Sequence, residues 1–570
     1  MPTSRGSCSG SGVLLELALE NRAPAALIFT SEDEMVLTLG AVIADRIFQR
    51  PVTVLRVSME CYRAMEAATN ASIEDGWLSI DDVEPGNARR RRWKMLEQRD
   101  SGNGYTSLRL NSSDEAILNG AHGVAARQAM EVVVTMAIAQ GAKELRSVSR
   151  GHVDGCILAH AANLIFAEHM RDLGAKVIIP TTINAISVDR ENWRAQGVDE
   201  DFGSRASRLA DAYVDVGCTR TFTCAPYLLD ESELPARHED IAWSESNAVF
   251  YANTVLGCRT EKLPDYLDLC IAMTGRAPCT GMYTSAGRAP HRVLRIDVSS
   301  PSARKERNRR RSCDGSVRDE DEDEDDDNGS ISGGTDDDDD DDAMWPLIGW
   351  LAGKLSPDRI PLLRGLEGYV MTSDNLKNLC AAFGTTSGAP MLHIRGHTPE
   401  AESVRIAAGA DRCSITRADL HQAWHELNMN FWLRHSDVHV RRVDLVAVGS
   451  PHASLTEMRK IVELLDGRVC HRETQTIVCV GRAVLRKAML EGVAAKLDAA
   501  GVRVIQDLCW CSITTPYFPD DARVVLTSSG KYAHYGNGLC GRDMMFASMA
   551  TCVEAMVSGV IHRGDPMPFS

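Results

Sequence analysis

Short runs of hydrophobic, largely β-branched residues alternate with longer amphipathic segments over most of the chain. The short runs are typical of buried strands, and apolar residues spaced three or four apart predict helices. Continuous apolar strands that alternate with helices indicate parallel sheets covered on both faces, so the predicted fold class is α/β. The predicted strands are 25–29, 52–57, 176–179, 391–394, 443–448, 476–480, 502–505 and 523–526, and the main predicted helices are 115–140, 157–173, 455–465 and 482–499.

Two stretches interrupt this pattern. Residues 69–105 are rich in Gly, Asp and Glu and contain four consecutive arginines, Arg89 to Arg92, so we interpret them as a linker. Residues 299–343 begin basic and end in two acidic blocks, Asp319 to Asp327 and Asp336 to Asp342. Because blocks of like charge repel one another and bury no apolar surface, this stretch is predicted to be a disordered insert.

The net charge of −17 over 570 residues is concentrated in that insert. Residues 301–342 hold eighteen acidic and seven basic residues, a net charge of −11, so only −6 belongs to the rest of the chain. The net charge of −17 argues against a protein that binds nucleic-acid phosphates as its main function, whereas the mildly acidic remainder of the chain says little about partners. The acidic insert is a candidate surface for basic proteins.

Seventeen cysteines are scattered from Cys8 to Cys552, an odd number in a large chain, which favours reduced thiols over a disulfide framework. The N-terminal segment has no apolar core of a signal peptide, and the long apolar segment 116–142 is interrupted by Arg127 and Glu131. We therefore expect a cytoplasmic protein without a membrane span.

The N-terminal segment Arg5 to Gly12 consists mainly of Gly and Ser and precedes an apolar helical stretch. A Gly-rich backbone at the start of a helix presents free N–H groups and the positive end of the helix dipole to an anion. Gly6, Ser7 and Ser9 are therefore candidate site residues. A flexible tail is the alternative interpretation.

Polar residues also gather where predicted strands end, which is the edge at which α/β sheets bind ligands. Among them, Cys224 and Cys509 could converge on iron or an iron–sulfur cluster. A zinc site is disfavoured because the chain has no pair of CxxC motifs. His152 and Asp154 could bind polar substrate atoms or move a proton, although a His-x-Asp pair on its own is more often a turn with a local hydrogen bond. The remaining strand-end motifs lie at 449–454, 507–511 and 527–536.

Taken in order, the motifs of the chain resemble those of the aconitase X family. The resemblance extends over nearly all of residues 1–68 and 106–570 apart from the insert. It rests on HisValAspGly at 152–155, ProThrThrIleAsnAla at 180–185, PheThrCysAlaProTyr at 222–227, residues 241–248, 252–260 and 274–278, GlySerProHis at 449–452, and SerGlyLysTyrAlaHisTyr at 529–535.

The resemblance implies an enzyme of the aconitase superfamily, a hydro-lyase with a large catalytic region of parallel sheets and a small swivelling α/β domain. We assign residues 1–68 to the swivelling domain and 106–570 to the catalytic region. The family has strands upstream of the Gly-Ser loop, so the swivelling domain is expected to be N-terminally incomplete here, which favours a mis-assigned start of the gene.

The resemblance also implies roles for individual residues. Ser7 fits the catalytic base best and Ser9 next. Lys531 and the backbone around Gly6 would hold a substrate carboxylate. The other implied substrate or proton-handling residues are His152, Asp154, Asn184, His452 and Ser529.

A cofactor is implied as well, either an iron–sulfur cluster or iron. Cys224 and Cys509 match the recurring cysteines of the family. Some members have cysteine where this chain has Ser450, which leaves Cys511 or no cysteine as the third ligand and leaves the cluster type open.

The reactions known in the family are two dehydrations of small molecules. The preferred substrate is cis-3-hydroxy-L-proline, converted to Δ1-pyrroline-2-carboxylate, because a single fused chain resembles that group more closely. Dehydration of mevalonate 5-phosphate is the alternative. A hypothesis of a different class is a catalytically impaired interaction protein that binds partners through its acidic insert.

Overall fold

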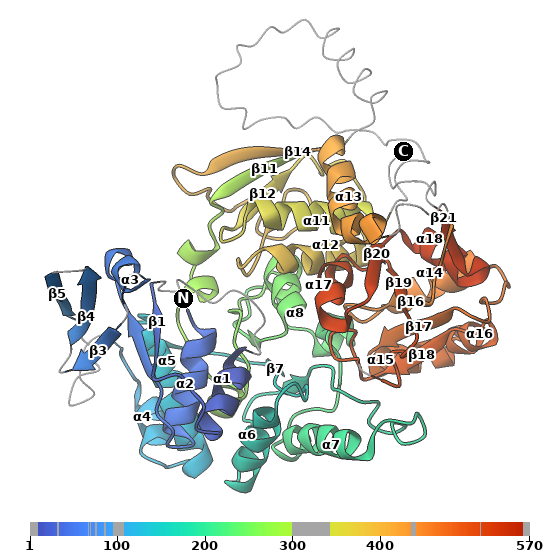
Figure 1. Cartoon of the computed structure of the whole chain (residues 1–570). Helices are drawn as coiled ribbons and strands as arrows, with labels where there is room; N and C mark the ends of the chain where they lie inside the picture. The colour runs from blue at the N-terminus through green and yellow to red at the C-terminus, as the bar shows by residue number, and fades with distance from the viewer. Residues whose placement is uncertain are drawn as a thin grey trace, which may run out of the picture.

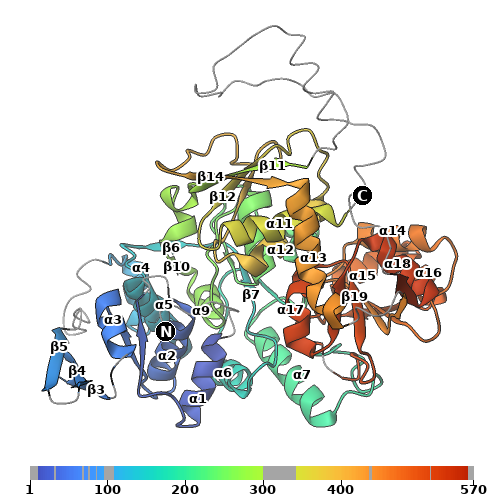
Figure 2. The same ribbon diagram turned by 45° about the horizontal axis from the view of Figure 1, so that its top comes forward.

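The structure is a computed structural model that describes residues 10–30, 34–66, 68, 70–74, 77–84, 87–94, 108–298, 342–434, 440–513 and 515–562. The N-terminal, middle and C-terminal parts of the chain form separate α/β regions that adjoin one another (Figure 1). In Figure 2 the middle sheet lies above, between the N-terminal helices on the left and the C-terminal sheet on the right. The predicted insert at 299–343 falls almost entirely outside the described residues.

The N-terminal region is a parallel pair of strands with helices packed beside it. Leu15 and Leu39, on its first two helices, are fully buried and join one core cluster with the helix 124–139 of the next region. This packing fixes the start of the first helix against the catalytic region. The elements are α1 (Gly10–Leu19), β1 (Ala26–Phe29), α2 (Val36–Arg46), β2 (Thr53–Arg56) and α3 (Met59–Glu66).

The prediction of a linker over 69–105 is wrong for residues 70–94, which form a three-stranded antiparallel sheet of β3 (Asn70–Glu74), β4 (Trp77–Glu84) and β5 (Asn87–Lys94). Leu78 is buried against Val57 and Cys61. The register places Arg89 opposite Asp82 and Arg90 opposite Asp81. The arginine run therefore lies within a strand.

The first part of the catalytic region is built on the parallel sheet β8-β7-β9. A second, antiparallel pair joins β6 and β10. The elements are α4 (Ser112–Leu118), α5 (Val124–Ala139), β6 (Leu145–Ser147), β7 (Gly151–Val153), α6 (Ala161–Asp172), β8 (Thr181–Ile183), α7 (Glu200–Asp215), β9 (Ala242–Trp243), α8 (Ser246–Tyr251), α9 (Leu267–Thr274) and β10 (Arg276–Pro278).

The middle part has one further sheet, and the C-terminal part has a larger sheet and the antiparallel pair β15-β21. All the pairings in the middle sheet and in the larger C-terminal sheet are parallel. The middle sheet has the order β13-β12-β11-β14, and the C-terminal sheet has the order β18-β17-β16-β19-β20. The middle elements are β11 (Arg292–Asp297), α11 (Met344–Leu355), β12 (Pro361–Arg364), α12 (Ser373–Thr386), β13 (His393–Ile394), β14 (Asp411–Thr416) and α13 (Arg417–Arg434). The C-terminal elements are β15 (Val440–Arg442), β16 (Leu445–Val448), α14 (Leu455–Leu465), β17 (Gln475–Val480), α15 (Arg482–Leu490), α16 (Val493–Ala499), β18 (Arg503–Gln506), β19 (Val524–Thr527), α17 (Gly530–Cys540), β20 (Asp543–Phe546), α18 (Met549–Ser558) and β21 (Val560–His562).

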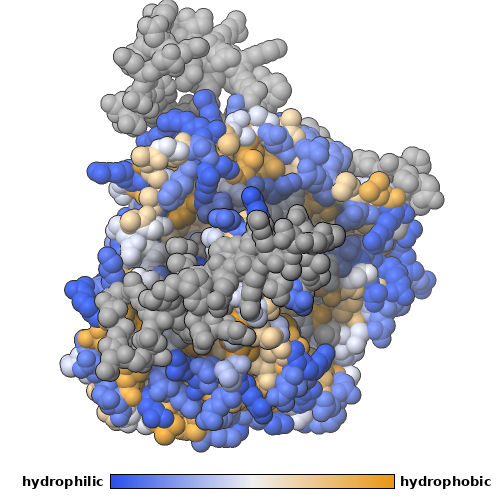
Figure 3. Space-filling model, turned by 60° about the vertical axis from the view of Figure 1, so that its left-hand side comes forward, coloured by the Kyte–Doolittle hydropathy of each residue, from blue (hydrophilic) through white to orange (hydrophobic). Residues whose placement is uncertain are grey.

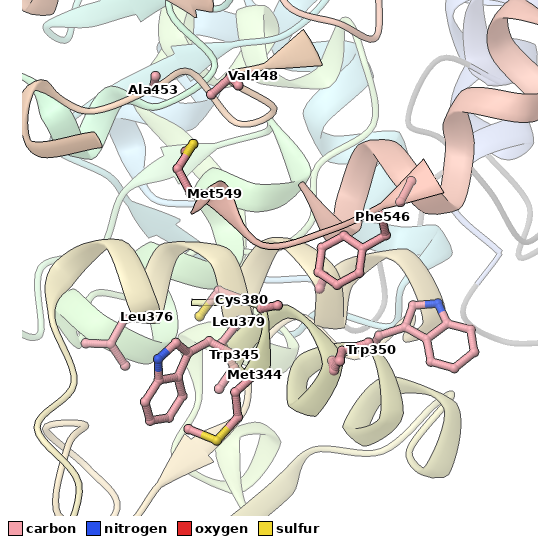
Figure 4. Close-up of a cluster of buried hydrophobic side chains, with 14 of the residues drawn as sticks. Met344, Trp345, Trp350, Leu376, Leu379, Cys380, Val448, Ala453, Phe546 and Met549 are labelled. Carbon is pink, nitrogen blue, oxygen red and sulfur yellow. The ribbon is translucent and has the colours of Figure 1, made fainter. Parts of the chain in front are cut away.

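One hydrophobic core joins these two parts. Trp345 and Leu379, on α11 and α12, share it with Val448, Phe546 and Met549 of the C-terminal part, as Figure 4 shows. Dense packing of this kind resists relative movement. The face in Figure 3 is predominantly hydrophilic, with hydrophobic side chains in scattered groups.

The predicted α/β class with parallel sheets is confirmed, and several element boundaries need correction. Residues 176–179 form no strand, because the amides of Val177 and Ile178 bond to two different segments, at Val216 and Ala272. The predicted helix 115–140 is two helices, α4 and α5, separated by glycines with positive φ at Gly120 and Gly123. The helix 482–499 is likewise divided at Gly492 into α15 and α16.

None of the helices in the described part of the chain is both long and apolar enough to cross a membrane.

Candidate active site

The carboxyl ends of two parallel sheets face each other in the centre of the molecule. Asp154, Asn184 and Glu245 follow β7, β8 and β9. His452 follows β16, and Lys531 follows β19. A bridge between Ile186 and Leu508 joins the two sides, and the Ile186 amide donates to the carbonyl of Asp507. Residues more than 300 positions apart in sequence therefore share one site.

Three cysteines meet at this junction. Cys224 ends a segment that runs alongside β8, and Cys509 and Cys511 follow β18. Cys224 and Cys509 are buried with Ala185 in one small cluster, and Cys511 packs against it while keeping partial exposure. Cys224 and Cys509 thus lie together with Cys511 beside them, and their role as metal ligands stays a prediction.

The three thiols interact with one another directly. A hydrogen bond with Cys224 raises the pKa of the Cys509 thiol, and a hydrogen bond with Cys509 together with burial raises the pKa of the Cys511 thiol. Three free thiols in one cluster are a donor set that suits iron–sulfur chemistry. Within the described residues, however, no three His, Cys, Asp or Glu side chains are positioned around a point that could hold a metal ion.

His452 connects the two cysteine-bearing loops. Its Nδ1 lies 3.2 Å from the Thr223 hydroxyl, next to Cys224, and its Nε2 lies 2.6 Å from the carbonyl oxygen of Leu508, next to Cys509. Its backbone N–H donates to the Cys224 sulfur at 3.3 Å. Burial lowers the pKa of His452 to about 4, so the ring is neutral, with Nε2–H donating to the carbonyl and Nδ1 accepting from threonine.

Lys531 supplies a positive charge beside the thiols. Its Nζ donates to Glu245 Oε1 at 2.8 Å, and both side chains are about nine-tenths buried, at 7% and 11% exposure. Burial alone would raise the pKa of Glu245, but the Lys531 ammonium outweighs that effect and the pKa falls to about 2. Asn247 donates to the same carboxylate oxygen at 2.6 Å. The pair is therefore ionised at neutral pH.

A chain of polar contacts leads from this pair toward the N-terminal region. The Asn184 amide donates to Glu245 Oε2 at 3.3 Å and to Asp154 Oδ1. The Asp154 amide donates to Asp268 Oδ2 at 2.7 Å, and the Ser244 hydroxyl donates to the same oxygen at 2.8 Å. Burial and the charge of Glu245 raise the pKa of Asp154 well above its usual range, which favours the protonated form of this carboxyl.

The first turn of α1 lies at the far end of this chain. The Ser11 hydroxyl donates to the carbonyl of Asp265 at 3.3 Å. Gly12 lies against Tyr266, so that a Cβ there would come within 2.9 Å of the phenol oxygen. This close approach leaves no room for a side chain at position 12, which explains the glycine there. Gly6, Ser7 and Ser9 lie just upstream, outside the described residues.

The other predicted residues lie near the junction in different roles. His152 is fully buried, its Nδ1 lies 2.8 Å from the Thr182 hydroxyl, and burial lowers its pKa to about 3. Ser529 is the N-cap of α17 and also donates to the Ser450 carbonyl. The hydroxyl of Ser450 is buried without a hydrogen-bond partner among the described residues.

Sequence reasoning missed the role of three acids. Glu245 lies in a motif that carried the family resemblance, yet its pairing with Lys531 has no local signal because 285 residues separate the two. Asp265 and Asp268 have no motif of their own, and only the fold brings them to Asp154. A buried carboxylate cluster of this kind can be recognised only once the sheets are assembled.

Family models of aconitase X match most of the chain. The first domain matches residues 107–286, the second domain 329–425, the third domain 443–558 and the swivel domain 1–80. The crystal structure of Thermococcus kodakaraensis aconitase X in its holo-form superposes with a TM-score of 0.64 and 23% identity, over 79% of this chain and all of that chain. This likeness supports the α/β fold.

Curated relatives align over almost the full length. Cis-3-hydroxy-L-proline dehydratase of Hypocrea jecorina is 39% identical over 99% of this chain and 88% of its own length. The Pseudomonas aeruginosa protein of the same name is 40% identical over 99% of this chain and 89% of its own length. Together with the matching domains and the site geometry, these similarities show that the chain belongs to the aconitase X family.

Proposed function

We propose that the protein is a hydro-lyase that dehydrates cis-3-hydroxy-L-proline to Δ1-pyrroline-2-carboxylate. The observation that carries the proposal is one buried site that combines three thiols, the Lys531 ammonium and the Asp154 carboxyl, whose pKa is raised by burial. The names of the two full-length relatives favour the same substrate.

The reaction removes the α-proton of the amino acid and the hydroxyl group on the neighbouring carbon. These leave together as water, and the enamine that forms tautomerises to the cyclic imine. The reaction needs a general acid beside the leaving hydroxyl group and a positive charge beside the substrate carboxylate. In our proposal Asp154 protonates the departing hydroxyl, and Lys531 stabilises the negative charge that builds up on the carboxylate.

The base in this proposal is a serine of the Gly-Ser segment, Ser7 first and Ser9 second, a role taken from the family resemblance. Support from the structure is indirect, since Ser11 and Gly12 bring that segment to Asp265, beside the acid cluster. His152 is the weaker candidate, because its neutral ring is fully buried and contacts Thr182. Asn184 orients Asp154, while His452 and Ser529 hold the surrounding loops.

We propose an iron–sulfur centre held by Cys224, Cys509 and Cys511 as the cofactor. The thiols are free and contact one another, and the buried Ser450 hydroxyl lies on the adjacent loop. When bound, such a centre supplies a Lewis acid for the leaving hydroxyl. His452 holds the two cysteine loops at a fixed spacing.

The setting that fits this chemistry is the cytoplasm, where thiols stay reduced. A small hydroxylated carboxylate in hydroxyproline metabolism is the partner we propose for the site. The acidic insert is a separate candidate surface for basic proteins.

A comparison of substrates tests the proposal. Protein purified without oxygen and supplied with iron and sulfide is incubated with cis-3-hydroxy-L-proline, trans-4-hydroxy-L-proline or mevalonate 5-phosphate, and products are followed by proton NMR. We expect the cyclic imine from the first compound alone. Conversion of mevalonate 5-phosphate, or of nothing at all by iron-loaded protein, would overturn the proposal.

A further inference from the structure

Glu245, Asp154, Asp265 and Asp268 form a cluster of buried acids, and Asp265 differs from the other three in its hydrogen bonding. Glu245 is paired with Lys531, Asp268 accepts from the Asp154 amide and the Ser244 hydroxyl, and Asp154 accepts from Asn184. Asp265 is 5% exposed, and its Oδ1 has no hydrogen-bond partner among the described residues. An unpartnered buried carboxyl is costly, so its retention calls for an explanation.

The phenol groups beside Asp265 are also unsatisfied. Tyr266 Oη and Tyr213 Oη are buried without partners within the described part of the chain, and the charge of Asp265 contributes to raising the pKa of both. Tyr266 has a φ of 83°, a conformation that is unfavourable for a residue with a side chain. Asp265 therefore influences both phenols electrostatically, and Tyr266, which follows it directly, lies against Gly12 of α1.

The charges around Asp265 call for a cation. Glu245, Asp154, Asp265 and Asp268 lie close enough to influence one another, and Lys531 forms an ion pair with Glu245. The two nearby histidines, His152 and His452, are neutral at physiological pH. Burial and the charge of Asp268 raise the pKa of Asp265 to about 8, as expected for a carboxyl whose counter-charge is missing.

We propose that Asp265, together with a neighbouring tyrosine hydroxyl, binds the ring ammonium of the substrate and thereby selects a cyclic amino acid over an anionic hydroxy acid. The inference rests on the proposed function for the class of substrate. A secondary ammonium has exactly two N–H donors, which match Asp265 Oδ1 and one phenol oxygen in number and charge. A doubly anionic phosphate ester without nitrogen offers no N–H donor to Asp265 and adds negative charge beside the Asp268 and Glu245 carboxyls.

Binding of two unreactive ring acids tests the inference without any turnover. L-Proline and cyclopentanecarboxylate have five-membered rings and one carboxylate each, and only L-proline carries the ammonium. We expect calorimetry on the iron-loaded protein to give at least about tenfold tighter binding of L-proline, the range of a charge-assisted hydrogen bond. The isosteric Asp265→Asn variant should lose that preference and bind cyclopentanecarboxylate as well as the wild type does.

Asp240→Asn is the matched control. Asp240 also has an unpartnered, buried oxygen, but it faces Arg146, Arg259 and Arg288, outside the cluster. This variant should keep the full preference for L-proline. Equal binding of the two ring acids by the wild type, or an unchanged preference in Asp265→Asn, would overturn the inference.

The remaining outcomes identify which proposal has failed. If an inorganic cation binds beside Asp265, the wild type binds both ring acids equally and added Na⁺ or K⁺ raises its melting temperature, which also contradicts the inference. If the protein prefers L-proline but does not convert cis-3-hydroxy-L-proline, the ammonium subsite stands and the proposed function fails.

Discussion

At the scale of the residue, the site depends on buried charges that are matched in different ways. The Lys531–Glu245 pair satisfies itself, whereas Asp265 has no donor on its Oδ1 among the described residues. Removal of one partner from a buried pair costs more than removal of both, because the remaining charge stays desolvated. Single and double substitutions at these residues can therefore distinguish an effect on the free energy of unfolding from an effect on turnover.

Replacement of Lys531 by Met leaves the Glu245 carboxylate buried without its cation. We expect a loss of about 3–5 kcal/mol in the free energy of unfolding, measured by urea denaturation. The double variant Lys531→Met, Glu245→Gln should recover most of that stability but none of the turnover. A double variant with substantial turnover would show that the lysine is only structural.

The buried pair Arg288–Glu400 supplies the control, since it lies at 2% and 14% exposure away from the thiols. Arg288→Met should destabilise the protein similarly. Its folded fraction should still turn over substrate at the normal rate.

Asp265→Asn should stabilise the ligand-free protein increasingly as the pH rises from about 4 to 8. The folded state holds the Asp265 proton up to a pKa of about 8, whereas the unfolded chain releases it near a pKa of about 4. Because the unfolded state then binds fewer protons, wild-type stability falls across this window, and the neutral amide avoids the loss.

Melting temperatures measured at several pH values check this expectation. The variant should exceed the wild type by roughly 2–4 °C or more at pH 8 and match it near pH 4. A difference that stays constant with pH would contradict the assignment of the proton to Asp265.

At the scale of the element, the apolar strand runs and the helices between them could be predicted because their patterns are local. Predicted strand 443–448 contains β16, and predicted helix 455–465 coincides with α14. Residues 176–179 could not be placed correctly, since strand formation there depends on which neighbours the amides meet. That Cys224 and Cys509 lie close together could be predicted from the sequence, because both follow predicted strands. The surroundings of Lys531 and Asp265 could not, because they depend on how two sheets face each other.

The cysteine loops should each be required for iron. We expect Cys224→Ser, Cys509→Ser and Cys511→Ser each to lower the iron content per chain at least several-fold, because each removes one of three gathered thiols. Cys279→Ser is the control, since Cys279 follows β10 outside that cluster. Iron and sulfide are measured chemically after anaerobic reconstitution. Full iron content in any of the three variants would exclude that cysteine as a ligand.

At the scale of the whole molecule, the site lies between regions that are far apart in sequence, and one core holds the middle and C-terminal parts together. Asp342, the last residue of the acidic blocks, is part of that body. It accepts from the Met549 amide at 3.0 Å and lies 3.4 Å from Lys460. Residues 299–341 lie outside the described structure. We expect their negative charge to have no role in catalysis.

Substitution of the acids between 319 and 341 by Ser and Asn, with Asp342 kept, should leave kcat/KM for the substrate within about twofold. Lys531 and Glu245 pair with each other inside the site, so we expect removal of these acids to change kcat/KM little. Binding of a basic protein such as a histone is measured in parallel. A large fall in kcat/KM would mean that the insert contributes to the active site.

The most direct test of the central claim is the rate of Δ1-pyrroline-2-carboxylate formation by iron-loaded wild type and Lys531→Met, Glu245→Gln, side by side at pH 7. We predict steady conversion of cis-3-hydroxy-L-proline by the wild type and a rate at least about a hundredfold lower in the folded double variant. Equal rates in the two proteins, or no imine from the wild type, would contradict a dehydratase site built around Lys531.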